Sequence, residues 1–255
     1  INLTPYSIWL ATVVVSGISY LSYLLKRYVF HESGTLVSGI IGGLYSSTAT
    51  ISVLARKSRK ASEQEATEYV AAMLLAVSMM FLRFMILILI FSREIFLSIY
   101  PYLLIMSVVS AIVGWFVHSR QKLPKDTSVE SEEDDSSNPL EFKVALIFAV
   151  LFVVFTVLTH YTLVYAGTSG LNLLSFVSGF SDITPFILNL LQNTGSVAVL
   201  IITACSMQAI VSNILVNMFY ALFFAGKRSK LRPWILGGFG AVIACNLVLL
   251  LFFYL

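Results

Sequence analysis

The sequence predicts an all-α integral membrane protein with six transmembrane helices and two opposed re-entrant helical hairpins in an inverted repeat. Three observations predict this fold: a composition poor in charge, eight apolar segments of which two are interrupted, and the placement of the basic residues. Of the 255 residues, 58% are hydrophobic and only 11% are charged. Soluble globular domains carry about 25% charged residues, so this composition indicates a chain surrounded by lipid.

Eight apolar segments have close to the roughly 20 residues that a helix needs to cross a bilayer. The second and the sixth segments are interrupted near their middles by glycine and hydroxyl residues, in the stretches SGIIGGLYSSTAT and SGFSDITP. The eight segments run from about Pro5 to Leu25, Gly34 to Ala55, Tyr69 to Phe91, Ile95 to Val117, Phe142 to Leu163, Leu171 to Leu191, Val197 to Phe224 and Trp234 to Leu255.

The basic residues indicate whether the two interrupted segments cross the membrane, because Lys and Arg favour cytoplasmic loops. We leave out Arg83, which lies within the third segment. Eight crossings would then divide the other 15 basic residues 7 to 8 between the two sides. If the interrupted segments instead turn back within the membrane, the division becomes 14 to 1, with only Arg93 outside. We therefore predict two hairpins, one entering from each side, with both ends of this chain outside.

The hairpins divide the chain into two similar halves. Residues 1–118 are the predicted first repeat, residues 119–140 a polar cytoplasmic linker, and residues 141–255 the second, inverted repeat. A shift of 136 residues pairs Thr48 with Thr184 and places Ser46 on Asp182. Each half has three crossings, so the halves must be inverted relative to each other. Inverted repeats with discontinuous helices are typical of transporters.

The two hairpin tips are the predicted site, because irregular backbone at membrane depth is tolerated only against protein or a water-filled cavity. Hydroxyl and carboxylate residues at the tips suit helix N-caps, and the half-helices would turn their positive N-terminal ends toward the midplane. Free carbonyls and hydroxyls there would suit Na⁺ or Mg²⁺. Helix breaks that serve packing alone are the alternative. The candidate ligands are Ser46, Ser47, Thr48, Ser181, Asp182 and Thr184.

Asp182 is the strongest candidate for a functional residue, because it is the only acid well inside an apolar segment. An ionised Asp at the bilayer centre costs about 2.5–3.5 kcal/mol on insertion scales, which marks it as functional by default. Asp182 would ligate a metal cation, carry a proton, or pair with Arg83, the only basic residue deep in a segment. An Asp182–Arg83 ion pair is also the plain structural explanation for both residues.

The seventh segment carries a polar stripe, in which Thr203, Ser206, Asn213 and Asn217 share one helical face. We expect Asn213 and Asn217 to line the cavity between the tips. Hydrogen bonding between helices is the alternative, because Ser, Thr and Asn serve this purpose in membranes.

Four stretches together resemble a known family: SGIIGGLYSSTATISVLARKSR, MMFLR, NPLEFKVAL and SGFSDIT. They are similar to the uncharacterised membrane domain that forms the C-terminal half of bacterial MgtC/SapB-type proteins. The resemblance covers nearly the whole chain and fits a multi-pass protein of the bacterial inner (plasma) membrane. That family often has an NxxxK pattern in the seventh helix, where this chain has Asn213 followed by Asn217. Its link to Mg²⁺ comes from a separate N-terminal module, so the resemblance says little about the substrate.

The sequence thus predicts a membrane transporter or channel for a small ion or polar solute, with a cation favoured because Asp182 lies at a tip. The alternative is a non-transporting module that regulates or assembles with other membrane proteins. We expect no enzyme, because intramembrane aspartyl hydrolysis needs two carboxylates and no phosphate-binding or dinucleotide motif is present. No cofactor is expected, and a bound Na⁺ or Mg²⁺ is left open. The expected partners are the lipid bilayer and the small ion or solute; a homodimer is left open, and nucleic acid is not expected.

Overall fold

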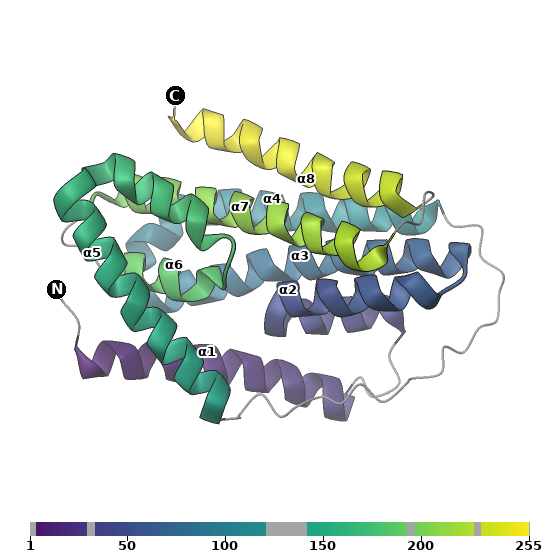
Figure 1. The fold of residues 1–255 in the computed structure, drawn as a ribbon, viewed down its shortest axis with the longest axis horizontal. Helices are drawn as coiled ribbons and strands as arrows, with labels where there is room; N and C mark the ends of the chain where they lie inside the picture. The colour runs from purple at the N-terminus through teal and green to yellow at the C-terminus, as the bar shows by residue number, and fades with distance from the viewer. Residues whose placement is uncertain (1–3, 30–33, 121–141, 193–196, 227–230, 255) are drawn as a thin grey trace.

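The computed structural model describes residues 4–29, 34–120, 142–192, 197–226 and 231–254, and the regular structure in these ranges is helical (Figure 1). A short π-helical stretch, Leu25–Val29, follows the first helix. The helices are α1 (Pro5–Leu24), α2 (Thr35–Lys60), α3 (Glu63–Phe91), α4 (Arg93–Ser119), α5 (Phe142–Ser178), α6 (Ile183–Gln192), α7 (Val199–Ala225) and α8 (Leu231–Tyr254).

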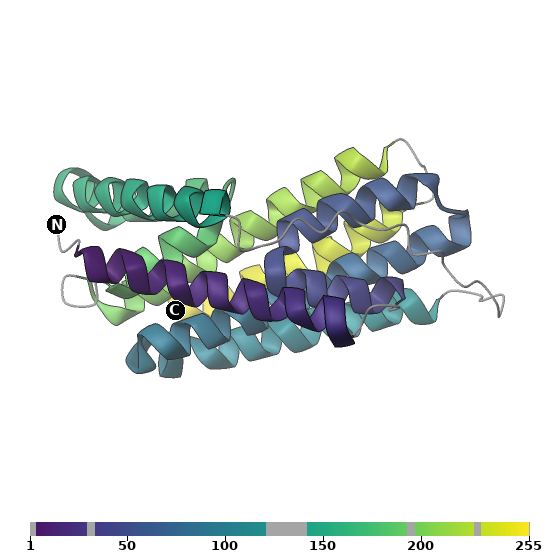
Figure 2. The ribbon, with the colours of Figure 1, turned by 90° about the horizontal axis from the view of Figure 1, so that it is seen from below.

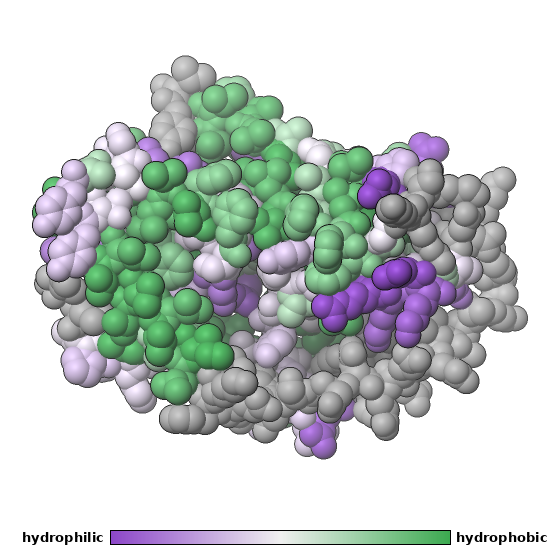
Figure 3. All heavy atoms as spheres, in the orientation of Figure 1, coloured by the Kyte–Doolittle hydropathy of each residue, from purple (hydrophilic) through white to green (hydrophobic). Residues whose placement is uncertain are grey.

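Seven of these helices are long and apolar enough to cross a membrane, which is what a multi-pass membrane protein requires; α6 has only 10 residues. Hydrophobic side chains cover much of the face shown in Figure 3, whereas the strongly hydrophilic ones gather toward one end of the molecule. The prediction of an all-helical membrane protein is therefore confirmed.

Helix α2 is broken at one residue, Ser46, whose backbone is extended (φ −157°, ψ 108°). After this break the chain runs back toward the end of the molecule from which it came (Figures 1 and 2). Gly42 and Thr50 lie against each other as a result, because a Cβ on Gly42 would lie 2.5 Å from Thr50 Oγ1. In a continuous helix two residues eight positions apart are separated by about 12 Å. We call Ser46 the first break.

Helix α5 also turns back, at Gly167, whose φ of 59° and ψ of −147° suit glycine and few other residues. A Cβ on Gly170 would lie 2.7 Å from Thr162 Cγ2, so the two parts of α5 are folded against each other. This turn falls between the predicted fifth and sixth segments, which end at Leu163 and begin at Leu171. One glycine makes the turn, and α5 then continues to Ser178. The chain is then non-helical over residues 179–182, which we call the second break, before α6 returns beside α5 (Figure 1).

The first part of α2 packs very closely on α3 through two glycines, four residues apart. A Cβ added to Gly39 would lie 2.4 Å from the Ala72 carbonyl oxygen, and one added to Gly43 would lie 2.6 Å from Ala76 Cα. Small residues at this spacing let the backbones of membrane helices approach each other. Helix α3 is buried along much of its length, and its residue Arg83 therefore lies in the interior.

Candidate functional site

Arg83 connects the two breaks. Its Nη1 donates a hydrogen bond of 2.6 Å to the carbonyl oxygen of Tyr45, the residue before the first break. Its Nη2 donates to the Thr184 hydroxyl, at 2.5 Å, in the first turn of α6. The Arg83 side chain is only 9% exposed. Two parts of the chain that are about 140 residues apart in sequence are therefore held together by one guanidinium group.

At the first break, Ser46 caps the second part of α2, since the backbone N–H of Ala49 donates to Ser46 Oγ at 3.3 Å. Ser47 is buried next to it. Thr48 is half-buried, and its carbonyl oxygen accepts a hydrogen bond from Ser52. An N-cap of this kind satisfies one of the N–H groups that a helix leaves without partners at its start. A capped helix therefore starts at the first break, inside the second apolar segment.

At the second break, Asp182 has the equivalent role. Its Oδ1 accepts the backbone N–H of Thr184 at 2.9 Å, which makes Asp182 the cap of α6. Ser181 donates to the carbonyl oxygen of Ser178. Asp182 and Ser181 are exposed, whereas Thr184 is fully buried. In Figure 3, hydrophilic atoms lie at the bottom of a hollow near the place of the second break in Figure 1. The sequence pairing of Ser46 with Asp182 therefore joins two residues with the same structural role.

Arg83 and Asp182 do not form the direct ion pair that the sequence left open, within the part of the chain that the structure describes. The reason is geometric: the carboxylate is turned toward the backbone N–H of Thr184, and the guanidinium is bonded to the hydroxyl of the same residue. Thr184 thus lies between the two charges. Instead of an ion pair, both residues form a hydrogen bond with Thr184, Arg83 with its hydroxyl and Asp182 with its backbone N–H.

The polar stripe of α7 holds the second break in place. Asn213 Nδ2 donates to the carbonyl oxygen of Gly179 at 3.2 Å, and Asn217 Nδ2 donates to Asn213 Oδ1 at 3.1 Å. Ser212 donates to the carbonyl oxygen of Phe176. Asn213 and Asn217 are buried, and their amide groups bond to each other within α7 and to the backbone of the second break. Asn217 Oδ1 is the atom of these two amides that lacks a partner among the described residues.

The chain matches one family over most of its length: the profile of a domain of unknown function, DUF4010, covers residues 13–225. The chain belongs to the DUF4010 family. An uncharacterized protein of Aquifex aeolicus (strain VF5) is 25% identical to this DUF4010 chain over 224 residues, which are 87% of this chain and 96% of that protein. No solved structure matches the chain.

Both breaks lie inside the part of the chain that matches DUF4010, and so does Arg83. Among the described residues no three His, Cys, Asp or Glu side chains cluster in a way that would hold a metal ion.

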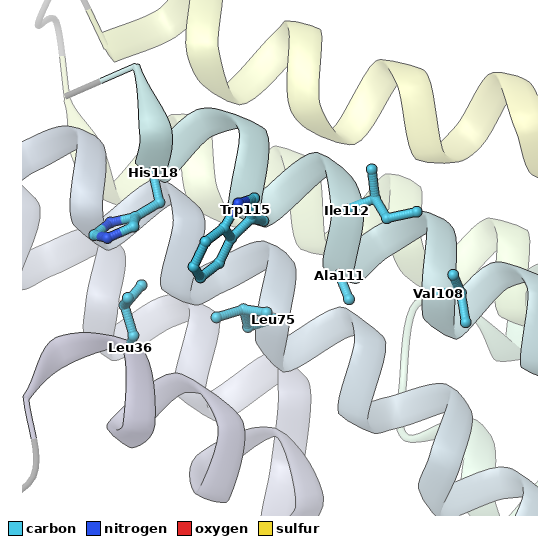
Figure 4. A pocket seen from close by; sticks show the side chains of 8 residues that line it. Leu36, Leu75, Val108, Ala111, Ile112, Trp115 and His118 are labelled. Carbon is cyan, nitrogen blue, oxygen red and sulfur yellow. The ribbon is translucent and has the colours of Figure 1, made fainter.

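An apolar hollow lies elsewhere, between the start of α2, the middle of α3 and α4 (Figure 4). This hollow of about 370 Å³ is lined by Leu36, Leu75, Val108, Ala111, Ile112, Gly114, Trp115 and His118. Its lining is almost wholly apolar, and Trp115 is 70% exposed. The hollow contains none of the residues that connect the breaks.

Sequence reasoning missed three parts of the site: the carbonyl group of Tyr45, the hydroxyl of Ser212 and the role of Gly179. A Cβ on Gly179 would lie 2.4 Å from Ser212 Cβ, so this glycine allows the second break to press against α7. The spacing of SG-x-SD hinted at a close approach of backbone there. Which helix approaches could not be deduced from that motif.

Proposed function

We propose that this DUF4010 protein is a membrane transporter or channel for a small ion or polar solute, with its site between the two breaks. One observation carries the proposal: a buried guanidinium is hydrogen-bonded to both breaks at once. Ionisable residues inside membrane segments are costly and are therefore a sign of function. Non-helical backbone at membrane depth is accepted only beside protein or a water-filled cavity. The two features occur together in this protein.

The proposed topology has six spanning segments and two re-entrant hairpins, one formed by α2 and the other by the end of α5 with α6. The reversal of the chain at Ser46 and at residues 179–182 supports it. The basic end of α2 also lies at the end of α7: Arg56 lies over the Phe224 ring, 4.4 Å from its centroid. A Cβ on Gly226 would lie 3.6 Å from Arg59. We place this basic end in the cytoplasm of a bacterium, with the protein in the inner membrane.

The halves 1–118 and 141–255 are then inverted repeats, as the equivalent caps Ser46 and Asp182 suggest. Opposed half-helices that begin at the midplane are the arrangement that many secondary transporters use to bind their substrates. Asp182 is exposed at its break and would carry a proton or contact the solute. No catalytic group is assigned, and the link to MgtC/SapB-type proteins stays a hypothesis.

Charge movement across proteoliposomes tests the function. Protein adsorbed on a solid-supported membrane would be exposed to rapid exchange of sodium chloride, potassium chloride, magnesium chloride, sodium phosphate and sodium acetate. We expect a current with at least one salt, and we expect Asp182→Asn to abolish it or remove its dependence on pH. Glu94→Gln is the matched control, because Glu94 is an exposed carboxylate in the first turn of α4. No current with any salt, or an unchanged current in Asp182→Asn, would overturn the proposal.

Cysteine labelling tests the topology separately. After replacement of Cys205 and Cys245, single cysteines at Arg27 and at Lys60, both exposed, should react with an impermeant reagent from the same side. A cysteine at Glu94 should react from the other side. Labelling of positions 27 and 60 from opposite sides would mean that α2 crosses the membrane, and the inverted repeat would be lost.

A further inference from the structure

The Arg83 side chain has donor capacity that the protein does not use. A guanidinium group carries five N–H donors. Nη1 and Nη2 are bonded to Tyr45 and Thr184, but Nε, which is also buried, has no hydrogen-bond partner among the described residues. A buried donor of a charged group costs free energy when it makes no hydrogen bond. The Nε–H is therefore free, among the described residues, to donate to a bound ligand.

Two helix N-termini lie beside the groups that Arg83 binds, which are the carbonyl oxygen that ends the first part of α2 and a hydroxyl in the first turn of α6. The second part of α2 starts directly after Ser46, one residue beyond Tyr45, and α6 starts at Ile183, one residue before Thr184. Each helix start carries a partial charge of roughly +0.5. Helix N-termini are established sites for anions, and here two of them are combined with a buried cationic side chain.

Several of the oxygen acceptors that a cation could use already accept a hydrogen bond. The carbonyl oxygen of Tyr45 accepts from Arg83, that of Phe176 from Ser212, and that of Gly179 from Asn213. Na⁺ and Mg²⁺ take oxygen ligands, and several of them. Asp182 supplies one carboxylate, of which Oδ1 already caps α6. Arg83 Nε is thus a free donor beside the breaks, whereas these three carbonyl oxygens each already accept a hydrogen bond; this balance favours an anion, contrary to the expectation of a cation from Asp182 alone.

We infer that the site between the two breaks binds an anion, and that the class it fits best is a small solute with a carboxylate or another oxyanion group. The inference rests on the proposed transport function and names the substrate class of the same site. Two oxygens on one centre match the edge of a guanidinium, where Nε–H is free beside Nη2. The N–H groups at the two helix starts would face the remaining negative charge.

Anion binding by the purified full chain tests the inference. The midpoint of thermal unfolding would be measured in detergent with sodium acetate, succinate, phosphate and sulfate, at constant sodium concentration and with chloride as the balancing anion. A second series would vary lithium, sodium, potassium and magnesium as chloride salts. A ligand that binds only the folded state raises the midpoint in a saturable way. We expect saturable stabilisation by at least one oxyanion.

Three variants test which side chains the anion binding depends on. Arg83→Gln should raise the half-saturating concentration of that anion by at least about tenfold, because a hydrogen bond to a charged group is lost. Arg93→Gln, which removes an exposed arginine at the start of α4, should leave it unchanged. Asp182→Asn keeps a good helix cap but removes a negative charge, so anion binding should be kept or become tighter. This sign is informative even if Arg83→Gln does not fold.

The outcomes separate this inference from the proposed function. Stabilisation by cations alone, lost in Asp182→Asn, would overturn the anion assignment and leave transport standing. Anion binding that Arg83→Gln preserves, or no stabilisation by any anion, would also overturn the assignment. Anion binding that depends on Arg83, combined with the absence of current in proteoliposomes, would support the binding site and reject transport.

Discussion

The two breaks perform the same task with different means. The first break uses a single extended residue, a neutral serine cap and two glycines that press α2 against α3. The second break uses four non-helical residues, an exposed aspartate cap and hydrogen bonds from α7. Arg83 binds the first through a backbone carbonyl and the second through a side chain. The first break is thus held by backbone packing, whereas the second depends on side chains and carries a carboxylate.

The largest expected loss of stability comes from the two glycines, Gly39 and Gly43, that precede the first break and pack on α3. Gly43→Ala places a Cβ 2.6 Å from both the Cα and the carbonyl oxygen of Ala76, which are backbone atoms of an enclosed helix. We expect a loss of about 3 kcal/mol in unfolding free energy, measured by SDS titration in mixed micelles. Gly240→Ala, where a Cβ meets open space, is the control and should not destabilise the protein. Equal midpoints for the two variants would contradict the close packing of α2 on α3.

The next effect concerns the side chain through which Arg83 reaches the second break. Thr184→Val keeps the shape of the residue but removes the acceptor of Arg83 Nη2, so a buried charged donor loses its partner. We expect a loss of about 1–3 kcal/mol in the same titration. Thr184→Ser retains the hydroxyl and should stay closer to the wild type. If valine and serine behave alike, the hydrogen bond does not hold the second break.

A smaller loss of stability is expected from removing either helix cap, and the two losses should be similar. Ser46→Ala and Asp182→Ala should each cost about 1 kcal/mol, because each removes the acceptor of a helix N–H group. Asp182→Asn should cost close to nothing in stability, since asparagine caps as well as aspartate. A large loss of stability in Asp182→Asn would show that the charge of Asp182 contributes to the fold, and it would weaken its assignment to transport.

The smallest effect is expected on α7. Asn213→Ala removes the donor to the Gly179 carbonyl oxygen, and hydrogen bonds between membrane helices average about 0.6 kcal/mol. The variant should therefore fold, and limited proteolysis or cysteine accessibility at Ser181 should report a looser second break. Accessibility at Ser46 should not change. A change at both positions would mean that the breaks are coupled more tightly than the contacts indicate.

Much of the fold could be predicted because lipid imposes simple rules. Segment length and apolarity placed the helices, and glycine with hydroxyl residues marked both breaks within a few residues. Residue type predicted an N-cap at each break, whereas the structure shows that Ser46 and Asp182 are the caps. The turn at Gly167 falls between the predicted fifth and sixth segments, but the apolar pattern could not show that one glycine alone would make it.

Residue type and local spacing were enough to establish the class of the protein, the position of the breaks and the rarity of charge within the apolar segments. What Arg83 binds depends instead on the packing of distant segments. Its partners lie 38 residues before it and 101 residues after it, and one of them is a backbone carbonyl that no side-chain pattern can reveal. The sequence therefore suggested an ion pair with Asp182, whereas the packing of α3 between the two breaks left the guanidinium bonded to both, with Nε unpartnered among the described residues.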